Sequence, residues 1–239
     1  MTDIEKLQTM INESKRIVFF GGAGVSTESG IKDFRSVDGL YNERYDYPPD
    51  VMLSRSFFNE HKTEFYKFYK DKLNCLDVEP NVTHQYLKKL EDQGKLSAIV
   101  TQNIDGLHEK TGNKNIYLLH GTIYKNHCMM CGKEYNAEYV FNSEVVIPRC
   151  KCKGIIKPDV VLYEEGLDNE TVNGAIDAIS NADMLIIGGT SLVVYPAASF
   201  IRYFRGKYLV IINRDSTSYD RNANLVIHDS LGNIFSKLK

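Results

Sequence analysis

Six short apolar runs, separated by polar or glycine-containing stretches, constrain the fold of this chain more than any other feature. Runs of this length are typical of buried strands. Two segments that lie between these runs, residues 83–90 and 170–179, carry apolar side chains at helical spacing. Ser230 can cap a last helix over residues 231–238. Alternating strands and helices form a parallel sheet covered on both faces. The predicted strands are residues 17–20, 98–100, 116–119, 184–187, 208–212 and 225–227.

Two segments depart from this alternation. Residues 38–74 are rich in aromatic side chains and resemble a helical excursion, whereas residues 124–158 hold four of the five cysteines and little apolar sequence. At about 150 residues per domain, a chain of 239 residues can form one large domain that carries a smaller one. We therefore expect residues 1–37, 75–123 and 159–239 to form the large domain, with the other two segments inserted as a small domain.

The clustered cysteines predict a metal site. Cys128 and Cys131 form a C-x2-C pair, and Cys150 and Cys152 follow after eighteen residues as a C-x-C pair. Two such pairs can supply four thiolates to a closed, structural Zn²⁺ site. The C-x-C spacing leaves one ligand of the second pair open, with His127 as the alternative donor. Zinc can contribute roughly 10–16 kcal/mol of binding free energy, enough to fold a segment with a small apolar core.

A glycine-rich stretch, Gly22-Ala23-Gly24, follows the first predicted strand directly. Glycines between a strand and a helix let backbone N–H groups approach a pyrophosphate, and the helix N-terminus adds a positive end. The alternative is that these glycines serve only tight packing. Thr27 stands where the dinucleotide fingerprint has glycine or alanine, which weakens a dehydrogenase interpretation.

A carboxylate, an aromatic ring and a guanidinium follow within one loop, at Asp33, Phe34 and Arg35. In a nucleotide site this loop could cover a ring and hold a phosphate through the planar guanidinium. The alternative is a surface Asp–Arg pair around a core phenylalanine.

Polar side chains also follow the other predicted strands. Asn103 and Asp105 come after residues 98–100, and His120 ends the strand over residues 116–119. Asn and Asp commonly form turns, but a histidine with a pKa near neutrality can act as a general base. The next two strands are followed by Gly188-Gly189-Thr190-Ser191 and Asn213-Arg214-Asp215. Because parallel strands end at one edge of the sheet, these five loops predict a binding cleft there.

Together these motifs resemble the sirtuin family of NAD-dependent protein deacylases. The resemblance extends from about residue 17 to residue 228 and is carried by residues 22–26, 29–31, 33–35, 101–108, 119–121, the paired cysteines, residues 157–161 and 189–192, and Asn213. It implies a Rossmann-like large domain, a small domain made of a zinc ribbon and a helical module, and a cleft between the two.

The resemblance also implies the site residues. NAD would contact Gly22, Ala23, Gly24, Thr27, Asp33, Phe34, Arg35, Gln102, Asn103, Ile104, Asp105, Gly189, Thr190, Ser191, Asn213 and Arg214. The acyl-lysine of a protein or peptide would enter near Phe34, His120 and Val161, and its backbone would pair with residues 163–166, which include Tyr163. His120 and Asn103 would be catalytic, with His120 as the base that acts on the ribose hydroxyls.

Three places depart from the family pattern, the first at Gly21, where a threonine is common. Lys32 stands where proline is usual before Asp-Phe-Arg, and Glu164 lies in a Tyr-Glu-Glu sequence where Phe-Gly-Glu is frequent. Lys32 removes a φ restraint from the loop. Glu164 lies in the segment expected to pair with the peptide, so it is expected to affect sequence preference.

Charge and composition bear on the alternatives. The 29 basic and 31 acidic side chains nearly balance, which argues against a zinc-ribbon module that binds nucleic acid. An NAD glycohydrolase or ADP-ribosyltransferase with the same cleft stays open as a second enzyme interpretation. The first residues lack the layout of a signal peptide, and glycines and Pro196 interrupt the uncharged stretch at residues 184–201. We therefore expect a cytoplasmic protein without a membrane partner.

Overall fold

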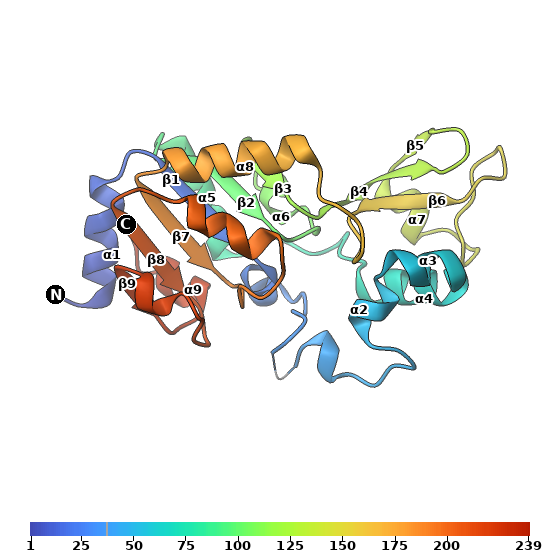
Figure 1. The fold of residues 1–239 in the computed structure, drawn as a ribbon, viewed down its shortest axis with the longest axis horizontal. Helices are drawn as coiled ribbons and strands as arrows, with labels where there is room; N and C mark the ends of the chain where they lie inside the picture. Colours follow the sequence, from blue (N-terminus) through green and yellow to red (C-terminus); the bar gives the residue numbers. More distant parts are fainter. Residues whose placement is uncertain (37) are drawn as a thin grey trace.

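The computed structural model describes residues 1–36 and 38–239, and its larger part is a sheet of six parallel strands (Figure 1). The order across the sheet is β3-β2-β1-β7-β8-β9, so the chain proceeds outward on one side and then on the other. The switch between β1 and β7 is where open α/β sheets place their ligands. The strands are β1 (Ile17–Gly21), β2 (Leu96–Thr101), β3 (Ile116–Leu118), β7 (Met184–Gly188), β8 (Tyr208–Ile212) and β9 (Leu225–Ile227). All six predicted strands are therefore confirmed.

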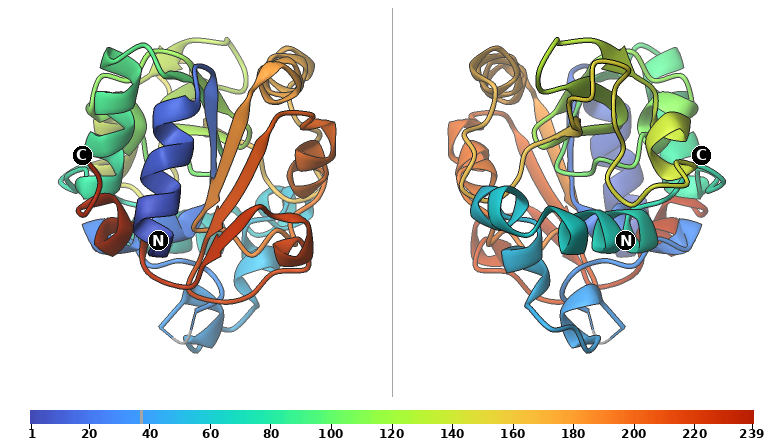
Figure 2. Two further views of the ribbon diagram at one scale, coloured as in Figure 1. Left: turned by 90° about the vertical axis from the view of Figure 1, so that its left-hand side faces the viewer. Right: turned by 90° about the vertical axis from the view of Figure 1, so that its right-hand side faces the viewer.

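Helices cover both faces of this sheet, as the sequence predicts (Figure 2, left). Helices α1 (Asp3–Glu13), α5 (Val82–Asp92) and α9 (Leu231–Phe235) pack against the face that carries Phe19. Helix α8 (Asn169–Asn181) and the 3₁₀ helix η4 (Ala197–Tyr203) pack against the face that carries Phe20. Neighbouring side chains of β1 thus point into two separate cores, because successive residues of a strand alternate between its faces.

The second part of the molecule contains a small antiparallel sheet with the order β5-β4-β6. It consists of β4 (Gly121–Cys128), β5 (Glu134–Tyr135) and β6 (Ile156–Val160), with α7 (Ala137–Phe141) beside it. The aromatic-rich segment forms the short helices α2 (Pro49–Met52), α3 (Arg55–Glu60) and α4 (Lys62–Lys72), which lie against this sheet (Figure 1).

The helical segment and the cysteine segment share one hydrophobic core. The ring of Tyr69 in α4 stacks on Phe65 at 5.7 Å and on Phe141 of α7 at 5.2 Å between ring centroids. These rings belong to a cluster that also contains Ile156 of β6, and none of it is shared with the cores of the large sheet. The boundaries of the two expected domains stay predictions, and the one between residues 37 and 38 falls on Val37, outside the described residues.

Two local predictions differ from the structure. The glycine stretch leads into two 3₁₀ turns, η1 (Ala23–Val25) and η2 (Thr27–Ser29), where an α-helix was expected. Glycine and β-branched residues here have low helix propensity, and Gly30 ends the second turn at φ 92°. The last helix ends at Phe235 although the apolar pattern extends to Leu238. The remaining short elements are η3 (Leu40–Asn42), α6 (Leu107–Lys110) and η5 (Asp220–Asn222).

Within the described residues, no helix combines the length and the apolar character required to cross a membrane.

Candidate active-site cleft and metal centre

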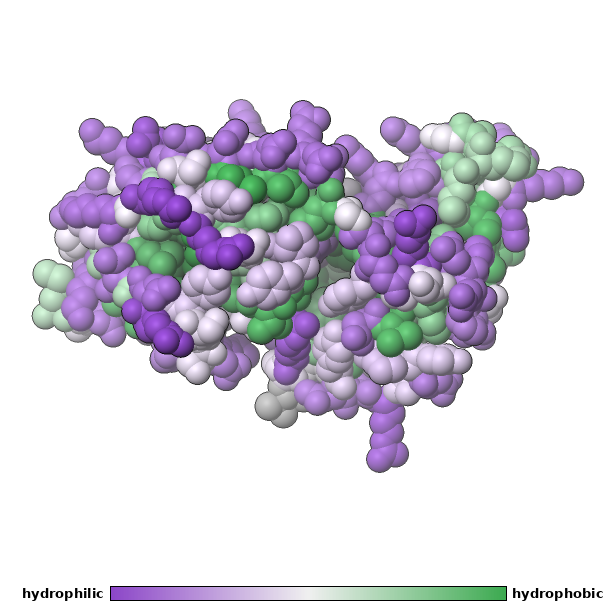
Figure 3. All heavy atoms as spheres, viewed as in Figure 1, coloured by the Kyte–Doolittle hydropathy of each residue, from purple (hydrophilic) through white to green (hydrophobic). Residues whose placement is uncertain are grey.

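A cavity of about 660 Å³ lies at the carboxyl edge of the large sheet, where the two parts of the molecule meet. Figure 3 shows this face hollowed between them. The five loops predicted from the strand ends all line the cavity, and so does every residue expected to contact the cofactor or substrate, from Gly22 to Arg214. The sequence rule that parallel strands converge at one edge is therefore confirmed for the placement of these residues.

The glycine turn packs directly against the loop that follows β7. The Gly24 N–H donates a hydrogen bond of 2.8 Å to the Gly189 carbonyl, and the Gly22 N–H donates one of 3.3 Å to Gly188. A Cβ atom on Gly24 would lie 2.8 Å from the Gly189 Cα atom, and Gly189 itself has φ 61°. These glycines therefore allow the close packing of the two loops, which was the alternative role considered for them.

This packing changes which groups can bind a phosphate. The N–H groups of Gly22 and Gly24 are bonded to the carbonyls of Gly188 and Gly189, so they are not available to a pyrophosphate. The N–H groups of Ala23 and Ser191 donate no hydrogen bond to any described residue, and both residues line the cavity. These two groups, from two different loops, are among the donors free for an anionic ligand.

The loop with Asp33, Phe34 and Arg35 covers one side of the cavity. Asp33 Oδ1 accepts hydrogen bonds from the N–H groups of Arg35 and Ser36 at 3.0 and 2.8 Å, so this carboxylate shapes the loop. It does not pair with the Arg35 guanidinium, which lies over the ring of Tyr41 at 5.3 Å and makes no ion pair with a described residue. The surface Asp–Arg pair is therefore wrong, and Arg35 keeps its charge for a ligand.

A buried polar cluster forms the inner end of the cavity. Ser26 Oγ donates a 2.6 Å hydrogen bond to Asp105 Oδ2, and Asn103 Nδ2 donates to Ser26 Oγ at 3.0 Å. Burial raises the pKa of Asp105, while the Ser26 hydroxyl and the Leu107 N–H counteract that shift. Asn103 and Asp105 are 8% and 6% exposed, so both are shielded from bulk water yet reach the cavity. This geometry provides amide and carboxylate groups for a small polar ring substituent.

His120 follows β3, and its side chain contacts the loop that follows the neighbouring strand β2. Its Nδ1 is 2.9 Å from the Gln102 carbonyl oxygen. Because a carbonyl can only accept, Nδ1 carries the proton in this contact, and Nε2 of the neutral ring is the acceptor. Burial lowers the pKa of His120, which keeps the ring neutral at pH 7. The ring is thus prepared to accept a proton at Nε2.

The segment expected to pair with a peptide is partly occupied. The Tyr163 N–H donates to the Leu53 carbonyl and the Tyr163 carbonyl accepts from the Arg55 N–H, both at 3.0 Å. Tyr163 lines the cavity but cannot offer these groups to a substrate strand. The backbone groups of Glu164 and Gly166 make no hydrogen bond with a described residue, so pairing with a peptide would pass through them.

Sequence reasoning missed two contributions to the cleft. Ser26 was part of a quoted motif but received no role, and its contact with Asp105 joins residues that are 79 positions apart. Residues Asp229, Ser230 and Leu231 also line the cavity. They follow β9, so the rule applied to five strand ends would have found them at the sixth.

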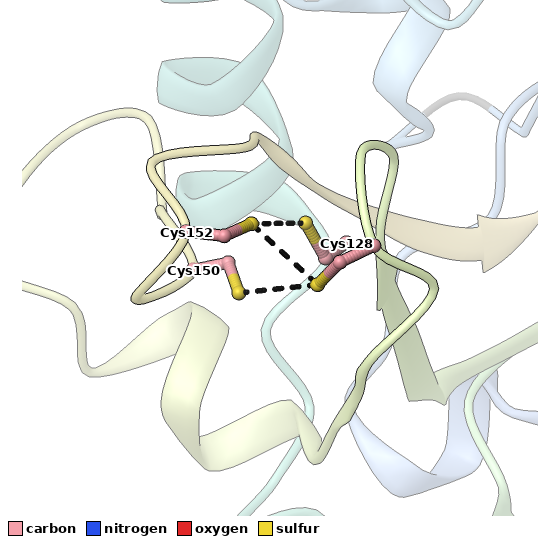
Figure 4. A group of neighbouring side chains, drawn as sticks. Cys128, Cys150 and Cys152 are labelled. Atoms are coloured by element: carbon pink, nitrogen blue, oxygen red, sulfur yellow. Dashed lines mark hydrogen bonds between the residues drawn. The ribbon is translucent and has the colours of Figure 1, made fainter.

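The four clustered cysteines converge on one point in the small part (Figure 4). Their sulfur atoms all lie within 4.8 Å of one another, and the Cys128–Cys152, Cys131–Cys152 and Cys131–Cys150 distances are 3.4, 3.5 and 3.6 Å. These distances exceed the roughly 2.05 Å of a disulfide bond. They approach the edge of about 3.8 Å expected for four sulfurs at 2.3 Å from one Zn²⁺.

Neighbouring residues agree with a four-cysteine site. A Cβ atom on Gly154 would lie 2.5 Å from Cys128 Sγ, so the turn leaves room only for glycine beside the sulfurs. Cys152 belongs to the cluster, which answers the question left by the C-x-C spacing. His127, the alternative donor, contacts Asp159 through Nδ1 and is outside the cluster. The four cysteines together can hold one zinc ion.

Comparison with known proteins agrees with the resemblance seen in the sequence. The model of the Sir2 family matches residues 22–196. A protein of Clostridium acetobutylicum named NAD-dependent protein deacetylase is 58% identical over 97% of this chain and 96% of its own length. A protein of the same name from Clostridium perfringens is 56% identical over 98% of each chain.

Solved structures give the same result. A Sir2 protein bound to p53 peptide and NAD⁺ has a TM-score of 0.86 and 35% identity, covering 99% of this chain and 97% of that one. A Sir2 variant with deacetylated p53 peptide and 3′-O-acetyl ADP-ribose has a TM-score of 0.90 and 34% identity, covering 98% and 96%. The fold and site therefore define a Rossmann-like protein with an inserted metal module. The chain belongs to the Sir2 family.

Proposed function

We propose that this protein is an NAD-dependent protein lysine deacetylase or deacylase that transfers the acyl group to ADP-ribose and releases nicotinamide. The observation that carries the proposal is the arrangement of His120, with its acceptor nitrogen free, beside the buried Ser26–Asn103–Asp105 cluster in one cavity. Family membership and the names of the relatives at 58% and 56% identity support it.

The cavity residues fit NAD by the groups that they leave free. Ala23 and Ser191 would donate N–H groups to the pyrophosphate, and the unpaired Arg35 guanidinium would add a positive charge near it. Asn103 and Asp105 would bind the carboxamide of the nicotinamide ring. When bound, NAD supplies an electrophilic ribose carbon and the acceptor hydroxyls for the acyl group.

The residues of this chain would orient the reactants and move one proton. His120 Nε2 would accept a proton from a ribose hydroxyl, because Nδ1 is occupied by the Gln102 carbonyl. Phe34 would close the cavity over the acyl-lysine and exclude water. Val161, whose N–H donates to the His120 carbonyl at 2.9 Å, would hold the entering lysine chain beside that ring.

The zinc ion would be structural. Four thiolates complete a tetrahedral site and leave no position for a substrate. The four cysteines join the end of β4 to the turn that contains Gly154, directly before β6. A zinc ion here would therefore help to fold the small domain, for which we keep the boundaries predicted from the sequence. The cysteines cluster as metal ligands, which is typical of proteins in a reducing compartment, and we propose a cytoplasmic location.

The experiment that tests this function follows an acetyl-lysine peptide by mass spectrometry with and without NAD. We expect NAD-dependent deacetylation by the wild type and a loss of about 10²–10⁴-fold in His120→Ala, the usual contribution of a general base. His127→Ala is the matched control, because His127 lies outside the cavity. Nicotinamide release that needs no peptide would contradict the proposal and favour NAD hydrolysis or ADP-ribosyl transfer.

A further inference from the structure

A second cavity opens beside the cleft, with a volume of about 430 Å³. It lies between the α2–α3 region and the turn after Val161, and Tyr163 and Glu164 line both cavities. The two hollows therefore share a wall, which is the segment expected to lie along a bound peptide. Its lining consists of Tyr47, Asp50, Val51, Ser54, Ser56, Phe57, Glu60, His61, Tyr163 and Glu164.

The shared wall is fixed by specific bonds. The Tyr163 backbone is bonded on both sides to Leu53 and Arg55, as described above. Glu164 has φ 73°, a conformation that glycine adopts more easily, and its carboxylate accepts hydrogen bonds from the Ser56 N–H and hydroxyl at 2.9 and 2.6 Å. A carboxylate thus stands where the frequent Phe-Gly-Glu sequence has no side chain. The bonds from Ser56 lower the pKa of Glu164, so it is ionised at pH 7.

The charge of this second cavity has one sign. Three carboxylates line it, Asp50, Glu60 and Glu164, and the lining includes no lysine or arginine. One Asp50 oxygen is buried without a hydrogen-bond partner among the described residues. Arg55 lies near Glu164 but outside the lining.

The walls between the carboxylates are aromatic and aliphatic. The rings of Tyr47, Phe57 and His61 pack together at centroid distances of 4.8–5.9 Å, and Tyr47 and Val51 remain 41% and 40% exposed. A lysine or arginine side chain matches such a surface, because its methylene stem covers apolar area while its charged end reaches carboxylates. A neutral or acidic side chain matches only one of these two features or neither.

We propose that the cavity around Asp50, Glu60 and Glu164 is a subsite for a lysine or arginine that flanks the acyl-lysine of the substrate. This inference rests on the proposed deacylase function and narrows its substrate class to acyl-lysine sequences with a nearby basic residue. Glu164 borders both cavities, so it would lie between the reacting lysine and the flanking basic side chain. The subsite acts on peptide binding and leaves the chemical step unchanged.

The test uses acetyl-lysine peptides in which each of three positions on either side carries alanine, arginine or glutamate. Deacetylation is followed by mass spectrometry, and the affinity of fluorescein-labelled peptides is measured independently of turnover. We expect arginine to exceed glutamate by about tenfold in kcat/KM at one or two positions, mostly through KM, and the ratio to fall at high salt. The variant D50N/E60Q should reduce the ratio to about twofold, and Glu60→Lys should reverse it.

The control is Glu64→Gln, a neutralised exposed carboxylate in α4 outside the lining, which should keep the full preference. Turnover of the all-alanine peptide reports the proposed function separately, and it should be equal in all these variants. If that peptide is not turned over, the deacylase function fails and the affinities still decide the subsite. Equal affinity for arginine and glutamate peptides, or a preference that persists in D50N/E60Q and Glu60→Lys, would overturn the subsite.

Discussion

The large sheet and the small antiparallel sheet obtain their cores in different ways. The central strands β1 and β7 are buried along their whole length, between helices on two faces. The small sheet has a strand of only two residues, β5, and its core depends on aromatic rings from a distant segment and on four sulfur atoms at one point. We therefore expect apolar burial to be sufficient for the large part, whereas we expect the small part to need the cross-link that a metal ion bound by the four cysteines would provide.

Removal of the metal is the change expected to have the largest effect, and it should unfold the small part while the large part stays folded. Without Zn²⁺ the four thiolates lose a binding free energy of roughly 10–16 kcal/mol, more than most domains have in total stability. We expect the chelated protein, or Cys150→Ala, to lose amide protection in β4, β6 and α7 while β1 and β7 stay protected. Hydrogen exchange followed by mass spectrometry measures this, and deacetylation should be lost together with the protection.

Cys75→Ala is the control for this experiment. Cys75 is buried with its sulfur 3.7 Å from the Asp105 carbonyl oxygen and lies outside the cysteine cluster. Metal content and the protection of β4 and β6 should remain unchanged in this variant. Protection of β4 and β6 that survives complete chelation would show that apolar packing alone holds the small sheet.

Acid should act on the large part instead. His84 in α5 and His108 in α6 are buried with their ring centroids 4.7 Å apart. Burial lowers the pKa of His84 to about 4 and that of His108 well below its usual 6.5. Between the usual pKa of 6.5 and these lower folded-state pKa values, the two imidazoles bind protons in the unfolded chain but not in the folded chain. The free energy of unfolding therefore falls as the pH falls through this window.

For His84 alone we expect a loss of about 3 kcal/mol between pH 7 and pH 4. Guanidinium unfolding at the two pH values measures this loss, and His84→Gln should reduce it because glutamine does not titrate. An equal loss in wild type and His84→Gln would contradict the assignment.

The smallest expected effect separates two tyrosines of the small core. Tyr66 and Tyr69 lie three residues apart in α4 and are both fully buried. The Tyr66 hydroxyl donates a 2.6 Å hydrogen bond to the Ile156 carbonyl, whereas the Tyr69 hydroxyl has no partner among the described residues. Tyr66→Phe should therefore cost about 1 kcal/mol of unfolding free energy, and Tyr69→Phe should be neutral or slightly stabilising. Thermal unfolding of the two variants compares them directly, and equal losses would remove the distinction.

The large sheet could be predicted from the sequence strand by strand. Each run, such as residues 208–212, is apolar on both sides, because a strand between two helical layers has no exposed face. The helix expected after Gly24 was wrong for a physical reason. Glycine and β-branched residues in this stretch have low helix propensity, and the chain instead turns at Ser26, whose hydroxyl contacts Asp105 in the loop after β2.

The sequence by itself determined the positions of the six strands, the four cysteines that can bind a metal, and the loops that meet at one edge of the sheet. These follow from periodicity and short spacings, which are properties of neighbouring residues. Only the tertiary structure decided which N–H groups stay free at Ala23 and Ser191, and that Tyr163 is already bonded to Leu53 and Arg55. It also created the acidic cavity beside Glu164. Such features depend on contacts between distant segments, and no local pattern specifies which backbone or side-chain groups those contacts will consume.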